Sequence, residues 1–352
     1  MNKEDSPTGR TPTLADVARV AGVSTATVSR FLNSPDRVIE ETRNRVRAAV
    51  SELGYAPNFN ARALAAKRTN TIGAIIPTME NAIFARGLQA FQEELGHNGI
   101  TLLVASSSYQ MNVEEEQIRT MVSRGADALL LIGYRRDPEI YEFLRRRGVP
   151  VVTTWVFDSD AGIPTVGFDN FQAMKALADK VISLGHRRIA TIMATTEGND
   201  RASERLNGIV AAMADAGLPE TDLSIIETTY GIDEGGAALE QLLALPTRPS
   251  VVMCGNDVLA VGVIARAKEM GLNVPEDLSV TGFDDIEIAK ISSPPLTTVH
   301  VPHRRMGKEA AKMLINLVGS NTRRENIQIE TSLQMRGSLA GCVNRSSVAD
   351  GS

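Results

Sequence analysis

A short stretch near the N-terminus carries side chains that could hydrogen-bond to the edges of base pairs. Thr25, Ala26 and Arg30 fall on one face of a predicted helix. Small residues at the start of a helix let it enter a DNA major groove, and an arginine one turn later can donate to guanine. We therefore expect Thr25 and Ala26 to meet base edges and Arg30 to contact a guanine. An ordinary helical hairpin is the alternative interpretation.

The same helix carries further polar residues. Thr27 and Ser29 are expected to contact phosphate or to support the helix, because phosphate contacts position a protein on DNA without reading its sequence. Asn33, at the end of the helix, is assigned to the same DNA-binding set.

Two helices and a sharp turn must hold these side chains in place. Thr13 can cap a first helix, and Ser24 can cap the second, so both belong to the expected DNA-binding unit. Gly22 stands at the turn, where a left-handed conformation costs glycine little. A third amphipathic helix is predicted over residues 40–53. Three helices with a small core make a headpiece of roughly fifty residues.

Charge is distributed unevenly along the chain. The segment from residue 12 to residue 68 holds nine Lys or Arg against five Asp or Glu, whereas the whole chain carries a net charge of −5. A basic head on an acidic body places the phosphate-seeking charge beside the predicted helix-turn-helix.

A short alanine-rich segment follows the headpiece. Asn58 can cap a helix through Leu64, with Ala61 as a small residue within it. Such a helix is too short to be stable alone in water. A plain linker is the alternative.

From residue 71 onward, apolar β-branched runs alternate with amphipathic helices, as in parallel α/β sheets. Strands are predicted at 72–76, 102–105, 128–132 and 151–154, and in a second set at 189–193, 223–226, 251–254 and 278–283. The sets indicate two doubly wound halves. Ligands of such sheets bind beyond the carboxyl ends of the strands, so two such edges can face each other across a cleft.

The sequence lacks the common motifs for catalysis, cofactor binding and metal binding. The first strand is followed by PTMENAIF rather than GxGxxG, and the sequence contains no GxxxxGK[ST], HExxH or GxSxG. His300 and His303 form an HxxH, which we interpret as a connecting segment rather than a metal site. We expect no enzyme activity, no cofactor and no metal.

Composition argues against a membrane-spanning protein and against a disulfide-rich one. With 43% apolar and 22% charged residues, the chain is typical of a soluble globular protein. Its apolar runs are too short to cross a bilayer. Two distant cysteines, Cys254 and Cys342, fit a reducing cytoplasm rather than a disulfide framework.

The ordered series of motifs resembles the lactose-repressor/galactose-repressor family of bacterial transcription regulators. The headpiece and its linker contribute TLADVARVAGVSTATVSRFLN, ETRNRVRAAVSELGYAPN and ARALAAKRTNTIG. The body contributes GHRRIATI, ERLNGIVAAM, CGNDVLAVG, VPEDLSVTGFDD and PPLTTVHVP, so the resemblance extends to about residue 340.

The resemblance implies a periplasmic-binding-protein-like body and a hinge helix that orders only on DNA. Two hinge helices, one from each subunit, would meet at the operator centre. Each would place Leu64 as an apolar wedge between base pairs in the minor groove. The alternative is that Leu64 packs on the surface of the body.

Loops of the body carry groups suited to a small polyhydroxylated ligand. Carboxylates and arginines bind hydroxyls, and an aromatic face can stack on a sugar ring. The expected effector-binding residues are Phe84, Trp155, Arg205, Tyr230, Asn256 and Asp284. Matching to the family's motifs implies effector contacts for Phe84 and, most directly, for Arg205 of ERLNGI, Asn256 of CGNDVLAVG and Asp284 of GFDD.

Two positions depart from the family's pattern. Several members have an aspartate where this chain has Trp155, and a tryptophan there would offer a flat platform without a negative charge. This change, and the likeness of TVGFDNFQA to gluconate-type repressors, favours a sugar acid over a neutral sugar. The third helix begins after Ile39, where the family usually has a capping serine.

The expected domains follow from these patterns. They are a leader (1–11), a helix-turn-helix domain (12–57), a hinge and linker (58–70), an effector-binding and dimerisation domain (71–340) and a polar tail (341–352). Within the body, one subdomain is expected over 71–167 plus 300–326, and the other over 168–299 plus 327–340.

We therefore predict a cytoplasmic, homodimeric regulator that acts as a repressor and binds palindromic operator DNA. A two-fold protein matches two half-sites. The alternative is a cytoplasmic sugar-binding or carbohydrate-processing protein whose N-terminal helices serve oligomerisation.

Overall fold

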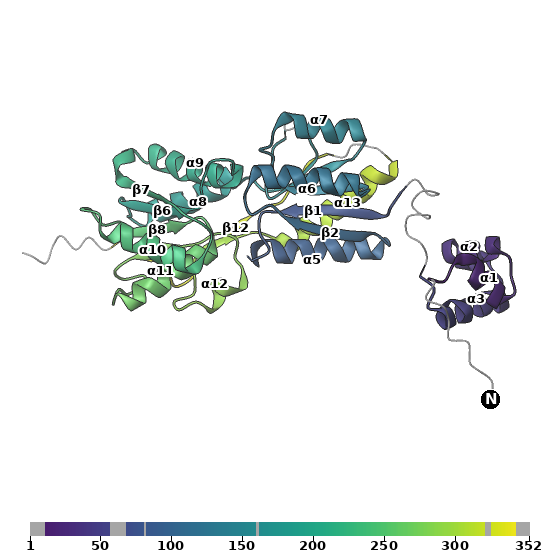
Figure 1. The fold of residues 1–352 in the computed structure, drawn as a ribbon. Helices are drawn as coiled ribbons and strands as arrows, with labels where there is room; N and C mark the ends of the chain where they lie inside the picture. Colours follow the sequence, from purple (N-terminus) through teal and green to yellow (C-terminus); the bar gives the residue numbers. More distant parts are fainter. Residues whose placement is uncertain (1–10, 57–67, 81, 160–161, 321–324, 343–352) are drawn as a thin grey trace, which may run out of the picture. The chain divides into compact units, whose positions relative to one another are not determined.

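The computed structural model describes residues 11–56, 68–80, 82–159, 162–320 and 325–342. The chain divides into two compact units, with the boundary between Thr69 and Asn70 (Figure 1). We call the first unit the headpiece and the second the body.

The headpiece consists of α1 (Leu14–Ala21), α2 (Thr25–Asn33) and α3 (Glu40–Leu53), with a short 3-10 turn at Pro35–Arg37. Gly22 ends α1 in the left-handed conformation, with a φ of 63°, as the sequence predicts. Ile39 precedes α3 and offers no side-chain cap, so the expected missing cap is confirmed. The three apolar faces meet in one cluster that contains Val17, Ala18, Ala21, Val28, Val46, Ala49 and Tyr55.

The first lobe of the body is built on a six-stranded parallel sheet in the order β11-β5-β4-β3-β1-β2. Its strands are β1 (Thr71–Ile76), β2 (Thr101–Ser106), β3 (Ala128–Ile132), β4 (Val151–Thr154), β5 (Thr165–Gly167) and β11 (Ile327–Gln328). Its helices are α5 (Ala82–His97), α6 (Met111–Ser123), α7 (Pro138–Arg147) and α13 (His303–Ser320).

Alternation along the strands explains why helices cover both faces of this sheet. Leu130 of β3 packs in the cluster that includes α5 and α13, whereas Leu129 and Leu131 pack in the cluster of α6 and α7. Successive side chains of a strand point to opposite faces, so a strand that is apolar at every position needs a layer on each side. α5 and α13 approach closely at Gly307, where a Cβ would lie 1.9 Å from the Gly87 carbonyl oxygen.

The second lobe repeats the arrangement with a four-stranded parallel sheet in the order β7-β6-β8-β9. Its strands are β6 (Ile189–Met193), β7 (Leu223–Glu227), β8 (Val251–Cys254) and β9 (Ser279–Thr281). Its helices are α8 (Asn170–Ser183), α9 (Asp200–Asp215), α10 (Ile232–Leu243), α11 (Asp257–Glu269) and α12 (Glu287–Ile291), with a 3-10 turn at Glu220–Asp222. The two sheets confirm the predicted doubly wound α/β body.

The chain passes between the lobes at three places. It leaves the first lobe after β5, and it returns beyond β10 (Thr298–His300), which pairs antiparallel with β12 (Ser332–Gln334). The third crossing lies after β11, because Ile327 and Gln328 pair with Val166 and Gly167 of β5. The expected subdomain boundary at residue 327 is therefore wrong by a few residues: β11 completes the edge of the first sheet before the chain crosses.

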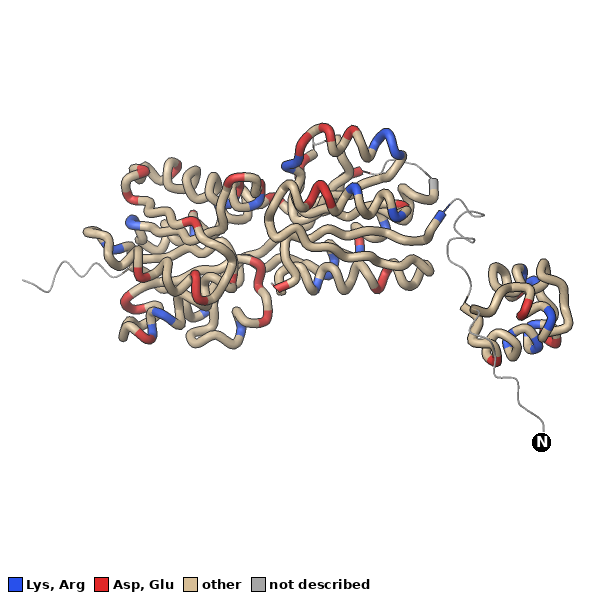
Figure 2. The backbone as a smooth tube through the Cα atoms, in the orientation of Figure 1, with Lys and Arg blue, Asp and Glu red and all other residues tan. Residues whose placement is uncertain are grey.

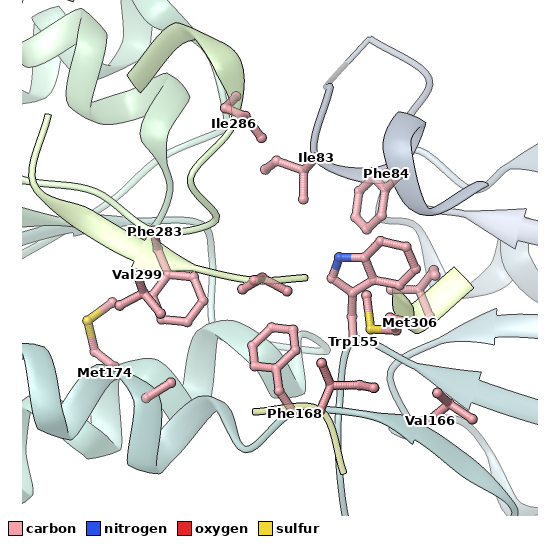
Figure 3. Packing of buried hydrophobic residues seen from close by; sticks show 14 of the residues in the cluster. Ile83, Phe84, Trp155, Val166, Phe168, Met174, Phe283, Ile286, Val299 and Met306 are labelled. Atoms are coloured by element: carbon pink, nitrogen blue, oxygen red, sulfur yellow. The ribbon is translucent and has the colours of Figure 1, made fainter. Parts of the chain in front are cut away.

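One apolar cluster runs through the crossings and joins the two lobes. Figure 3 shows Phe283, Val299 and Met174 on one side of it and Phe84, Trp155 and Met306 on the other. Phe168, which follows β5, stacks on Phe283 with the ring centroids 6.0 Å apart. The body therefore has a continuous core beneath the groups that face the cleft.

Candidate DNA-reading helix and effector cleft

The caps of α1 and α2 fix the helix-turn-helix. Thr13 and Asp16 form a reciprocal capping box, in which the Asp16 carboxylate accepts the Thr13 N–H at 2.9 Å. The Ser24 hydroxyl accepts the Thr27 N–H at 3.2 Å. Each cap satisfies backbone N–H groups at the start of a helix, so Thr13 and Ser24 have structural roles in the absence of DNA.

The outer face of α2 presents three of the predicted residues to solvent. Thr25, Ala26 and Arg30 are exposed, whereas Val28 on the opposite face is buried. Thr27 and Ser29 are half-buried. Both side chains make hydrogen bonds at or within α2. The Thr27 hydroxyl bonds to the Ser24 hydroxyl, and the Ser29 hydroxyl accepts a hydrogen bond from the Asn33 amide. The groups free for base edges are therefore those of Thr25, Ala26 and Arg30.

The hinge residues Asn58, Ala61 and Leu64 lie outside the described residues. The sequence nevertheless places much of the positive charge in and beside this segment. Arg62, Lys67 and Arg68 supply most of the excess of basic over acidic residues between residues 12 and 68. In Figure 2, acidic and basic residues are interspersed along the headpiece itself.

A cleft of about 1110 Å³ opens between the two lobes of the body. Its walls come from the loops that follow β1, β2, β6 and β7, at residues 77–80, 107–110, 194–199 and 228–231. All four loops lie at the carboxyl ends of parallel strands, which is the place that the sequence predicts for a ligand.

Tyr230 is the one predicted effector residue among the described residues that line this cleft. Its ring packs against Tyr109 from the opposite lobe, with the centroids 5.7 Å apart. Burial raises the pKa of the Tyr230 phenol above its ordinary value, so the hydroxyl stays neutral and can donate a hydrogen bond. Sequence reasoning missed Tyr109, although it follows β2 as Tyr230 follows β7.

Arg205 and Asp284 meet in the interior, with the Arg205 Nη2 and Asp284 Oδ1 atoms 3.8 Å apart. Arg205 is anchored by the Asn170 side chain at 2.9 Å and the Gly255 carbonyl at 2.6 Å, and it lies over the Phe283 ring. Asp284 is fully buried, and neither carboxylate oxygen has a hydrogen-bond partner among the described residues.

His303 completes this group from the first lobe. Its Nε2 atom lies 3.5 Å from Asp284 Oδ1, and it too has no hydrogen-bond partner in the described part of the chain. The sequence interpretation treated the HxxH as a connecting segment and therefore missed His303. His300 is separate, because its Nδ1 lies 2.9 Å from Asp285. The described residues contain no cluster of three metal-ligating side chains.

Asn256 has two roles in the structure. Its carbonyl oxygen caps α11 by accepting the Leu259 N–H at 2.9 Å, while its amide nitrogen is buried without a partner in the part that is described. The neighbouring Asp257 is structural, because it accepts the Thr298 hydroxyl and the Ile286 N–H, and burial raises its pKa well above the ordinary value.

The expected placement of Trp155 needs correction. Its side chain is only 2% exposed and packs 5.2 Å from the Phe84 ring and 6.0 Å from the His303 ring, measured between centroids. Neither Trp155 nor Phe84 lines the cleft, so Trp155 is not an open platform there. The reason is that Trp155 directly follows a central strand and extends the shared core (Figure 3). Its indole N–H has no partner among the described atoms.

Two family models match the chain. Residues 13–58 match "Bacterial regulatory proteins, lacI family", and residues 178–339 match "Periplasmic binding protein-like domain". The described helices include none long and apolar enough to span a membrane.

Relatives match over nearly the full length. The chain is 35% identical to the HTH-type transcriptional repressor CytR of Escherichia coli K12, covering 93% of this chain and 96% of that protein. The Lac repressor dimer bound to operator and the anti-inducer ONPF matches with a TM-score of 0.82 and 25% identity, covering 94% and 100% of the two chains. The transcriptional regulator CelR–cellobiose complex matches with a TM-score of 0.67 and 30% identity, covering 93% and 99%.

Proposed function

The chain belongs to the lacI family of bacterial regulatory proteins, and from that premise we propose that it represses genes for the use of a carbohydrate or sugar acid. As a member it is a DNA-binding transcription regulator with an effector-binding body, acting in the cytoplasm as a homodimer. The proposal adds that a small metabolite in the cleft alters operator affinity through Tyr230, which lines the cleft, and through Arg205 and Asp284, which are buried outside its lining.

The buried, unpaired carboxylate of Asp284 carries this proposal. Buried polar groups in native proteins almost always have hydrogen-bond partners, and a carboxylate with none among the described residues can accept donors from a ligand. Asp284 shares this condition with the Asn256 amide, the Trp155 indole and His303 Nε2. Two hydroxyl groups of a sugar would supply the donors that both oxygens of Asp284 lack.

Charge in the cleft favours a neutral ligand. Among the described lining residues, six are acidic and three are arginines, and one of those arginines, Arg86, is paired with Glu287. An anionic sugar acid would meet a net negative wall. Because Trp155 lies in the core, its lack of charge no longer argues for a sugar acid. A complex of the structural relative CelR with cellobiose supports a neutral sugar as the class to test.

The alternative function assigns the N-terminal helices to oligomerisation and would bury Arg30 and Leu64. Arg30 is exposed, which supports the regulator, whereas Leu64 lies outside the described residues. We propose no catalytic role for the body: in its described part the hydroxyl–imidazole contact between Ser250 and His186, at 2.9 Å, lies outside the lining of the cleft.

An electrophoretic mobility shift with the DNA upstream of the protein's own gene tests the proposal. We expect binding to a palindromic segment, and loss of binding when one half-site is scrambled. Addition of neutral sugars should weaken this binding, and the corresponding sugar acids at equal concentration provide the comparison. Failure to bind any upstream segment at low salt would contradict the regulator function.

A further inference from the structure

A single carboxylate joins the two lobes along one edge of the cleft. Asp200 begins α9 in the second lobe, and its Oδ2 atom accepts hydrogen bonds from two backbone N–H groups of the first lobe. The donors are Tyr134 at 2.5 Å and Arg135 at 3.0 Å, both in the loop between β3 and α7. These two helices, α7 and α9, lie along the same side of the body in Figure 1.

The other carboxylate oxygen is held within the second lobe. Asp200 Oδ1 accepts the Arg201 backbone N–H and the Arg201 guanidinium, each at 2.8 Å. The side chain of Asp200 is 2% exposed. Four donors therefore surround one buried anion, and hydrogen bonds to a charged acceptor are the strong ones.

The loop that donates to Asp200 is also held by side chains of its own lobe. Arg136 donates to the carbonyls of Ile132 and Gly133 and pairs with Glu114 at 2.8 Å. The Tyr141 hydroxyl donates to the Tyr134 carbonyl at 2.8 Å. With its carbonyls held in this way, the loop directs the N–H groups of Tyr134 and Arg135 outward to the second lobe.

Gly133 makes room for this contact. Its φ is 75°, and a Cβ there would lie 2.1 Å from Arg201 Nη1 and 2.6 Å from Asp200 Oδ1. Any side chain at this position would push against the charged pair of the opposite lobe. The close contact between the lobes therefore needs both the carboxylate of Asp200 and the missing side chain of Gly133.

On the other edge, the lobes meet through a different kind of contact. Arg86 of α5 pairs with Glu287 of α12 at 3.3 Å, but the side chains are 45% and 79% exposed. An ion pair this exposed contributes little. It offers a matched control, since it also joins the lobes at the cleft.

We propose that Asp200 is an interlobe latch, which holds the lobes in the arrangement seen here and so sets the balance between closed and open forms of the cleft. Opening along this edge must break both backbone hydrogen bonds. Loss of the latch therefore shifts the population toward the open form, and the consequence for operator control rests on the proposed function.

Hydrogen exchange of the full-length wild type and variants, followed by mass spectrometry, tests the latch directly. The amides of Tyr134 and Arg135 are its donors, so their exchange reports whether Asp200 holds them. We expect Asp200→Ala to speed exchange of the 133–137 segment by about tenfold or more, because two charge-assisted bonds are lost. Glu287→Gln should leave that segment unchanged. Equal exchange in wild type and Asp200→Ala would overturn the latch.

A second variant approaches the latch from the first lobe. Gly133→Ala should raise exchange in the same segment, and combining it with Asp200→Ala should add little, since both remove one contact. Fully additive effects would also overturn the proposal. Thermal melts establish that each variant is folded before exchange is compared.

The effect of the latch on operator binding is measured in a separate experiment. If the latch sets the closed population, Asp200→Ala changes operator affinity in the mobility shift, whereas Asp215→Asn, at a surface pair outside the cleft, does not. Altered exchange with unchanged operator affinity would keep the latch but separate it from DNA control. Failure of the wild type to bind operator would instead count against the proposed function alone.

Discussion

Asp284 places a negative charge in the interior next to Arg205 and His303 without a hydrogen bond to either. Burying a charge is costly unless it is paired, and the Arg205 guanidinium supplies that compensation at 3.8 Å, while His303 Nε2 lies at 3.5 Å. At those distances the carboxylate lone pairs stay available. The arrangement is therefore suited to accept donors from a ligand rather than to stabilise the fold.

Removing the charge at Asp284 should abolish the effector response. Asp284→Asn suits the site, because asparagine tolerates the positive φ of 102° found there. We expect affinity for a neutral sugar to fall by about tenfold to a hundredfold, with operator binding intact. Trp155 is the only tryptophan of the chain and lies beside His303, so its fluorescence can follow the titration. Asp215→Asn, at an exposed surface pair with Lys175, should change neither property; unchanged sugar affinity in Asp284→Asn would move the site elsewhere.

His186 gives a pH-dependent contribution to stability. It lies buried between the Ser250 hydroxyl and the Ala340 carbonyl, and burial lowers its pKa below the ordinary value of 6.5. As the pH falls below about 6.5, the unfolded chain binds a proton at this residue before the folded chain does, so stability is lost. Relative to His186→Gln, the wild type should lose free energy of unfolding between about pH 7.5 and about pH 5.5. Urea unfolding of both proteins measures this, and a pH-independent difference would contradict the assignment.

At the scale of elements, α2 is held by its own caps and by the core of the headpiece. Ser24 fixes its start and Val28 anchors its inner face, which leaves Thr25, Ala26 and Arg30 exposed. An exposed arginine on an anchored helix can be aimed at one base pair, which is what direct readout needs.

Arg30→Ala should cost base discrimination at one operator position. A bidentate arginine–guanine contact is worth roughly 1–3 kcal/mol, so the penalty for changing that base pair should largely disappear. A panel of operator variants in the mobility shift measures the discrimination. Arg124→Ala, an exposed arginine of the body, serves as the matched control. If Arg30→Ala kept the wild-type ranking of operators, its contact would be to phosphate.

The hinge segment yields a separate prediction, which rests on the sequence because residues 57–67 lie outside the described residues. Leu64→Ser should weaken operator binding strongly and reduce DNA bending, because the apolar wedge that unstacks a base step would be lost. Dimerisation and sugar affinity should be unchanged. Leu245→Ser, at a leucine 39% exposed on the body, is the control. Operator affinity within about a factor of two of wild type would leave the wedge without support.

At the scale of the whole molecule, the body joins two similar lobes through three crossings and one shared core. The group of Arg205, Asp284 and His303, the cleft and the Asp200 contact all lie where the lobes meet. A ligand that contacts both lobes can act on their relative arrangement, and a change in that arrangement can transmit a signal without direct contact between ligand and DNA.

The operator-binding form should be a dimer. One headpiece reads one half-site, so two chains of 37.9 kDa are needed for a palindrome. Sedimentation of the full-length protein should give the mass of two chains, with and without operator. A mass near four chains would contradict this prediction, and so would full operator affinity in a monomer.

Local features were the ones that the sequence determined. The helices of the headpiece, the caps Thr13 and Ser24, the turn at Gly22 and the absence of a cap at Ile39 all depend on neighbours a few residues away. Eight of the ten described strands of the two sheets were predicted, because each is an apolar, β-branched run, whereas the short strands β5 and β11 were not. The parallel topology then placed the ligand site in the loops at the carboxyl ends of the strands, and the cleft is lined by such loops.

Long-range contacts were decided only by the tertiary structure. The sequence predicts Trp155 in a loop, but its side chain is packed in the core. His303 was assigned to a connecting segment, but its side chain lies beside Asp284. Asp200 and the loop at Tyr134 come from different lobes, and no local pattern pairs a carboxylate with two distant backbone N–H groups. Such contacts depend on how two lobes approach in space, which periodicity and spacing along one chain do not encode.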